Sequence, residues 1–173
     1  MNNTSEYFLD LSQSNGLGRP AISIFLRGCD KEVPCSGCHN MELYNETDNE
    51  IYLEELQNVL RDYLEQYASI YGTQNIQVAI LGGEPLSRKN RSVTHAISRY
   101  IKEMYNTSTV IVYSWRTLED IEEENLSRFL RYVDYGVLGA FEEENFVPNT
   151  IPSSSNQGIY NLKTGFKQRN IIL

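Results

Sequence analysis

The stretch IQVAILGGEPL, residues 76–86, gives the clearest indication of the fold. Apolar side chains follow one another almost without interruption from Ile76 to Leu81, and the run stops at Gly82-Gly83. A strand with one solvated face alternates apolar and polar residues, whereas a parallel strand covered on both faces is apolar throughout. The stretch therefore predicts a buried parallel strand that ends in a bend.

Strand and helix patterns alternate along the rest of the chain. Strand-like runs occupy residues 21–29, 108–114 and 134–141, and apolar side chains recur at helical spacing in residues 51–67, 92–105 and 117–133. Thr117 is expected to cap the last of these helices, with Asp120 three residues further on. This alternation implies right-handed crossovers, so we expect an α/β fold with a mostly parallel sheet and outer helices.

Length and composition are those of a single domain, residues 1–173. The chain is 40% hydrophobic and 22% charged, as is ordinary for a globular protein, and its net charge of −8 argues against nucleic-acid binding. The opening MNNTSEYFLD has no basic and apolar signal pattern, and no run of apolar residues is long enough to span a membrane. We therefore expect a cytoplasmic protein with reduced thiols and no membrane partner.

All three cysteines lie in RGCDKEVPCSGCHN, residues 27–40, and the first of them is the last residue of the strand predicted at residues 21–29. An odd number of clustered cysteines in a reducing compartment favours a metal site over disulfides. Thiolates suit iron–sulfur clusters or zinc. Because a cubane cluster has four irons, ligation by Cys29, Cys35 and Cys38 would leave one iron open to a small molecule.

A structural zinc site is the alternative interpretation of the same residues. It would use His39 as the fourth ligand, since zinc sites of this kind take four protein ligands. His39 directly follows Cys38, which makes simultaneous tetrahedral ligation by both side chains awkward. The chain would then be a non-catalytic, zinc-stabilised interaction domain.

Two loops of unusual composition are expected to meet at one edge of the sheet. The cysteine loop follows the strand at residues 21–29, and Gly82-Gly83-Glu84 follows the strand at residues 76–81. Ligands of parallel α/β sheets bind at the carboxyl ends of the strands. We therefore expect the cysteines and the glycines to form one site.

These motifs, in this order, resemble the radical S-adenosylmethionine (SAM) superfamily, and more narrowly the activating proteins of anaerobic (class III) ribonucleotide reductase. The resemblance covers residues 15–162 and is carried by six segments: NGLGRPAISIFLRGC (15–29), CSGCHN (35–40), GGEPL (82–86), IVYSWRTLEDI (111–121), VDYGVLGAFEEE (133–144) and SSSNQGIYNL (153–162). The cysteine spacing here is C-x5-C-x2-C, where the family usually has C-x3-C-x2-C.

The resemblance implies a partial (β/α) barrel and a set of cofactor-binding residues. Cys29, Cys35 and Cys38 would hold a [4Fe–4S] cluster whose open iron binds SAM. Gly37, Cys38 and His39 match the family's positions on the nucleoside side of SAM, and Gly82, Gly83 and Glu84 would bind its methionyl end. Ser114, at the end of the strand predicted at residues 108–114, is expected to reach the same ligand. Among these, the glycines would let the backbone approach the ligand, and Glu84 would accept a hydrogen bond from the SAM amino group.

The implied activity is reductive cleavage of SAM to generate a glycyl radical on a partner enzyme. The partner would be anaerobic ribonucleotide reductase, and reduced flavodoxin or a similar protein would supply the electron. No residue acts as a general acid or base in this scheme, because the cofactors carry the chemistry. A radical SAM enzyme acting on another glycyl-radical enzyme, a peptide or a small molecule is the alternative within the same superfamily.

Overall fold

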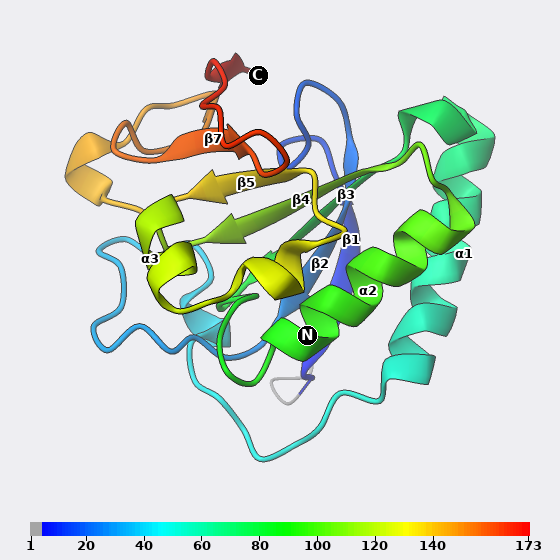
Figure 1. Cartoon of the computed structure of the whole chain (residues 1–173), viewed down its shortest axis with the longest axis horizontal. Coiled ribbons are helices and arrows are strands. Elements are labelled where there is room, and N and C mark those ends of the chain that lie inside the picture. The colour runs from blue at the N-terminus through cyan, green and yellow to red at the C-terminus, as the bar shows by residue number, and fades with distance from the viewer. Residues whose placement is uncertain (1–4) are drawn as a thin grey trace.

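A six-stranded sheet forms the centre of the computed structural model, which describes residues 5–173 (Figure 1). Its strands in spatial order are β1 (Tyr7–Ser12), β2 (Ala21–Leu26), β3 (Gln77–Gly82), β4 (Thr109–Ser114), β5 (Tyr135–Leu138) and β7 (Gly158–Asn161). β2 to β5 are parallel and lie on the four predicted strands. β1 and β7 are antiparallel edge strands that the sequence patterns did not predict. Residues 13–20 are too short a connection to join β1 and β2 in parallel.

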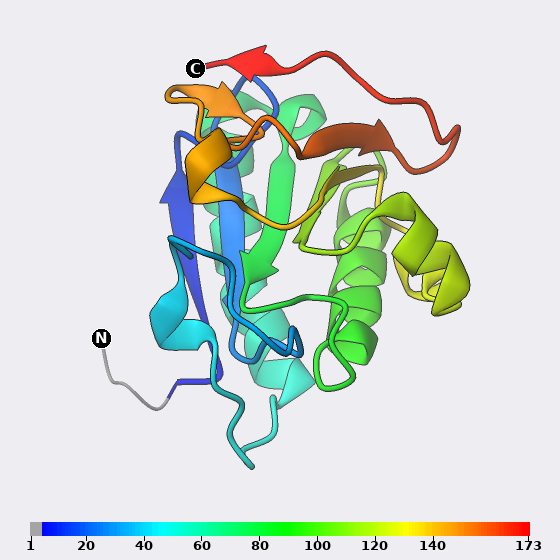
Figure 2. The same ribbon diagram turned by 90° about the vertical axis from the view of Figure 1, so that its left-hand side faces the viewer.

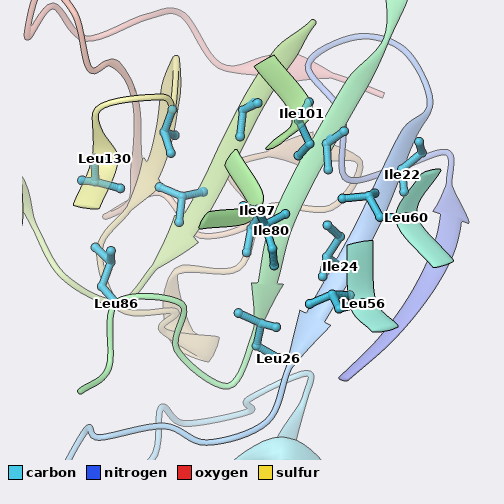
Figure 3. Close-up of a cluster of buried hydrophobic side chains, with 14 of the residues drawn as sticks. Ile22, Ile24, Leu26, Leu56, Leu60, Ile80, Leu86, Ile97, Ile101 and Leu130 are labelled. Carbon is cyan, nitrogen blue, oxygen red and sulfur yellow. The ribbon is translucent and has the colours of Figure 1, made fainter. Parts of the chain in front are cut away.

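Both long helices, α1 (Leu53–Tyr71) and α2 (Arg91–Met104), pack on the same face of the sheet. Successive side chains of a strand point to opposite faces, so every second residue of the central strands meets these helices. Figure 3 shows this layer, which includes the fully buried side chains Ile22, Ile24, Leu26, Leu56, Leu60, Ile80, Ile97 and Ile101. Burying each of these side chains contributes roughly 1.5–3 kcal/mol relative to exposure.

The other face of the sheet is covered by segments of irregular structure. Leu81, Tyr113 and Val137 point to this side and belong to two smaller apolar clusters. The cluster that contains Val137 also contains residues of a two-stranded sheet formed by β6 (Thr150–Ile151) and β8 (Ile171–Ile172). In Figure 2 this C-terminal part of the chain, orange to red, lies across one end of the main sheet.

The helix predicted over residues 117–133 is interrupted in the structure. α3 (Leu118–Glu123) ends before Asn125, which has a φ of 56°, and a 3-10 helix, η3, follows at Ser127–Leu130. A left-handed residue cannot continue an α-helix, and the sequence pattern gave no sign of this break. The predicted cap is confirmed, since the Thr117 side chain accepts a hydrogen bond from the backbone N–H of Asp120.

Three further 3-10 helices lie in the connections: η1 (Met41–Leu43), η2 (Thr73–Asn75) and η4 (Glu143–Asn145). Within residues 5–173, no helix has the length and apolar character that crossing a bilayer demands.

Replacing Leu60 by alanine should lower the free energy of unfolding by about 2–5 kcal/mol, because it leaves a cavity between α1 and the sheet. Val59, its neighbour on α1, is 40% exposed while Leu60 is fully buried, so Val59→Ala should change stability by no more than about 0.5 kcal/mol. Urea denaturation of both variants measures the difference. Equal losses would contradict the packing of this helix.

Candidate functional site

The cysteine loop begins where β2 ends and is tied to residues further along the chain. The backbone N–H groups of Gly28 and Cys29 donate to the carbonyls of Leu43 and Tyr44, each over 2.8 Å. The Tyr44 hydroxyl in turn donates to the carbonyl of Lys31. Hydrogen bonds to Leu43 and Tyr44 therefore hold the start of the loop that carries the thiols.

The bend after β3, Gly82–Glu84, lies directly against the start of this loop. The backbone N–H of Gly83 donates to the carbonyl of Leu26 over 2.8 Å, and that of Glu84 to the carbonyl of Gly28 over 2.7 Å. A Cβ on Gly83 would stand 2.3 Å from the carbonyl oxygen of Gly28, closer than any side chain can approach. The contact between the two loops therefore requires glycine at residue 83.

Asn90, fully buried at the start of α2, binds the backbone of the same two loops through its side chain. Its side-chain amide nitrogen lies 3.0 Å from the carbonyl oxygen of Arg27, 3.3 Å from that of Gly28 and 3.1 Å from that of Glu84. Because hydrogen bonds in a water-free environment are stronger than at the surface, this amide fixes the position of the bend relative to Cys29.

Glu84 makes its contacts inside the protein. Its carboxylate accepts hydrogen bonds from the backbone N–H groups of Leu86 and Trp115, over 2.9 and 3.0 Å, and from the Ser114 hydroxyl over 2.8 Å. Burial raises the pKa of Glu84 to about 7, although Arg116, 3.6 Å away, and these hydrogen bonds act in the opposite direction. The predicted hydrogen bond from Glu84 to a bound amino group stays a prediction.

Arg116 connects three of the loops that follow the parallel strands. Its guanidinium forms ion pairs with Asp30 over 2.8 Å and with Glu124 over 2.9 Å, and it stacks on Trp115 at 4.4 Å from the ring centroid. Burial acts to raise the pKa of Asp30, but the hydrogen bonds from Arg116 and Trp115 outweigh it and hold that pKa below its usual value. Arg116 therefore anchors the residue that follows Cys29.

A cavity of about 480 Å³ extends along the face of the sheet opposite α1 and α2. This volume falls in the range of about 300–1,000 Å³ found for small-molecule sites. Seven of the nine predicted site residues line it: Cys29, Cys35, Cys38, His39, Gly82, Gly83 and Ser114. The lining thus joins the two loops that the sequence placed at one edge of the sheet.

Gly37 and Glu84 are the two predicted site residues outside this lining. Gly37 has a φ of +67°, and a Cβ added there would lie 3.0 Å from the side chain of Glu143. The glycine therefore serves a turn and a close contact with the segment after β5. Its predicted contact with a nucleoside stays a prediction.

Much of the cavity wall comes from residues that the sequence patterns did not single out. Aromatic side chains supply one part, and Phe141 packs on His39 with ring centroids 4.5 Å apart. Further polar lining comes from Asn15, Asn40, Asn149, Ser153 and Gln157. Asn15, Asn40, Ser153 and Gln157 lie in segments that carry the resemblance, but none was predicted as a site residue, and residues 139–141 were expected to continue a strand that ends at Leu138.

The three thiols are free, partly buried, and lie around the cavity. Burial raises the pKa of Cys29 to about 11 and also raises that of Cys35. In the part of the chain that the structure describes, no three His, Cys, Asp or Glu side chains converge on a point as one metal ion requires. In a cubane cluster each thiolate binds a different iron, so three thiols that line one cavity are the kind of donor set that such a cluster takes.

The comparisons with known proteins agree with this donor set, which is that of an iron–sulfur protein. The model of the family described as "4Fe-4S single cluster domain" matches residues 14–160, and the chain belongs to this family. No curated protein and no solved structure is similar enough to count as a match. The matched residues include the cysteine loop, the glycine bend and most of the cavity wall.

The buried carboxyl of Glu84 should make the stability of the metal-free protein depend on pH. The unfolded chain releases this proton near pH 4.5, whereas the folded protein keeps it up to about pH 7. The stabilisation is therefore complete below pH 4.5 and is lost as the pH rises toward 7. Relative to Glu84→Gln, the native chain should lose about 3 kcal/mol of unfolding free energy over this interval. Urea titrations at several pH values measure this, and parallel curves for the two proteins would contradict it.

Proposed function

We propose that this chain is a radical SAM activase that holds a [4Fe–4S] cluster through Cys29, Cys35 and Cys38. The observation that carries the proposal is the cavity that these three thiols share with Gly82 and Gly83. Three thiolates leave one iron of a cubane cluster without a protein ligand, and a ligand pocket beside that iron is what SAM binding requires. Membership of the cluster family and the resemblance over residues 15–162 support the same function.

We further propose that the sheet corresponds to the partial barrel of radical SAM proteins. In such a barrel the helices lie outside and the ligand inside. The packing of α1 and α2 on one face, with the cavity on the other, supports this correspondence. The antiparallel β1 and β7 then form the edges of the opening.

When bound, the cluster would supply the electron that cleaves the carbon–sulfur bond of SAM, and the resulting radical would take a hydrogen atom from a glycine of the partner. The chain's own residues bind the cofactors and shield them from water. His39 and Phe141 offer flat surfaces to a nucleoside, and Ser114, held by its hydrogen bond to Glu84, offers its oxygen to the same ligand. Leu81, Tyr113 and Val137 exclude water from the sheet side of the cavity.

The substrate we propose is a glycyl-radical loop of a second protein, that of anaerobic ribonucleotide reductase. Residues 5–173 leave one side of the cavity open, and Phe146 and Leu173 on its wall are each 51% exposed. Exposed apolar side chains beside an open site favour completion of that site by a partner protein. Reduced flavodoxin or a similar protein of the cytoplasm would supply the electron, because the cleavage of SAM consumes one electron that the chain's own residues do not provide.

Replacing Cys29, Cys35 or Cys38 by alanine should lower the iron and sulfide retained after anaerobic reconstitution by at least about tenfold, because ligand loss exceeds the effect of losing an outer-shell partner. Ser36→Ala, between two of these cysteines, is the matched control and should retain the native amount. Metal analysis measures both. One zinc per chain and no sulfide in the native protein would instead support the interaction domain.

Incubation of the reconstituted protein with SAM, a reductant and a class III reductase should produce 5′-deoxyadenosine and a glycyl doublet in electron paramagnetic resonance. The doublet should be absent with a reductase whose radical glycine is replaced by alanine. Formation of 5′-deoxyadenosine without a doublet would reject this partner and favour another radical SAM substrate. Failure of an intact cluster to cleave SAM would reject the activity itself.

A further inference from the structure

Arginine and aromatic side chains gather where α2 packs against η3. We call Arg91, Arg128, Phe129, Arg131 and Tyr132 the arginine face. The guanidinium carbons of Arg91 and Arg128 lie 5.3 and 4.7 Å from the centre of the Phe129 ring, and that of Arg131 lies 5.9 Å from the centre of the Tyr132 ring. Such contacts hold a guanidinium in place through the π-electrons of the ring.

The arginines of the arginine face form no ion pair within residues 5–173, although the exposed acidic residues Glu122–Glu124 precede η3 in the chain. Within residues 5–173, no carboxylate lies within 4.0 Å of the guanidinium nitrogens of Arg91, Arg128 or Arg131. Arg128 and Arg131 are exposed, and the Lys163 ammonium donates to the carbonyl of Arg131, which adds a fourth cation. The rings contact the guanidiniums through their π-faces, so the N–H donors of the forks stay available to an anion.

This concentration of positive charge occurs in a chain whose net charge is −8. A positive region on a negative molecule orients an approaching acidic partner toward that one place and raises the rate of encounter. No residue of the arginine face lines the cavity at the site, so this face suits a broad partner surface better than a small ligand. The overall charge disfavours nucleic acid as the occupant.

The arginine face also lies close to the loop that carries Cys29. Arg91 follows Asn90, whose side-chain amide reaches the carbonyl oxygens of Arg27 and Gly28 over 3.0 and 3.3 Å. Arg27 and Gly28 directly precede Cys29 in the chain. The Arg91 end of the arginine face is therefore linked, through Asn90, to the backbone directly before Cys29, and none of its residues lines the cavity.

We propose that the arginine face is the docking surface for the acidic surface of a one-electron donor protein. The inference rests on the proposed function, since the cleavage of SAM consumes one electron that the chain does not supply. At this step the donor is oxidised by one electron, the cluster is reduced by one electron, and no bond is formed or broken. Docking outside the cavity leaves the open side of the site free for SAM and the second protein.

The test follows the reduction of the reconstituted cluster, by its visible absorption, with a reduced flavodoxin of acidic surface as the probe. The variant is Arg128→Glu with Arg131→Glu, and a milder one is Arg128→Gln with Arg131→Gln. The matched control is Arg19→Glu with Arg61→Glu, two exposed arginines of which Arg19 lies before β2, at the opposite end of that strand from Cys29. This control changes the net charge by the same amount. Dithionite, a small reductant that needs no docking surface, reports whether each cluster is intact.

The charge-reversed variant should be reduced by flavodoxin at least about tenfold more slowly than the native protein, with the glutamine variant between them. The control should stay within about twofold of native, and dithionite should reduce all four proteins alike. The native rate should fall steeply as salt is raised, because ions screen the attraction between the two surfaces.

Equal slowing of the variant and the control would show that only net charge matters and would overturn the proposal. A native rate that is independent of salt, or an unaffected variant, would overturn it too. Should charge reversal impair the cluster, the glutamine variant and the native salt dependence still decide. Because the readout is cluster reduction, a protein that accepts electrons through this face but fails to cleave SAM would reject the proposed function and leave the docking surface standing.

Discussion

The site depends on the close approach of two backbones, that of the bend at Gly82–Glu84 and that of the cysteine loop at Gly28. The N–H groups of the bend bond to carbonyls at the end of β2 over 2.7–2.8 Å, and only glycine at residue 83 leaves room for this contact. The distance between the thiols and the bend is therefore set by backbone hydrogen bonds rather than by mobile side chains. A binding site held in this way is preorganised, which lowers the entropic cost of ordering it around a ligand.

Around this contact, buried polar groups fix the positions of the loops through directional hydrogen bonds, which apolar packing does not provide. Asn90 bonds to the carbonyls on either side of the contact, and Glu84 and Arg116 extend the network to β4 and to Asp30. Each of these groups would be costly to bury alone, but in the network they compensate one another. This network fixes the positions of the loops that follow β2, β3 and β4, while the aliphatic layer under α1 and α2 supplies stability.

The central strands and the two long helices were predictable because they have strong local patterns. The apolar run at residues 76–81 located β3 to within a residue, and the order of elements predicted that the cysteines and glycines would meet. The break at Asn125 and the edge strands were not predicted, because a single backbone angle and a tertiary pairing leave little trace in composition. The internal contacts of Glu84 with Ser114 and with the backbone of Leu86 and Trp115 were not predicted, since a motif does not reveal which way a buried side chain turns. The wall from residues 139–157 was missed because its contacts are distant in sequence.

Substitutions on the two faces of the sheet differ in how much folding stability they remove. On the side of α1 and α2, close packing ties each aliphatic side chain to several neighbours, so substitutions there are felt by the whole domain. On the other side, the segment from Gly139 to Gln157 meets the sheet through smaller apolar clusters and surrounds a cavity. Divergence can therefore reshape the ligand side of this molecule at little thermodynamic cost. One scaffold could in this way acquire new substrates during evolution while the half that drives folding stays the same.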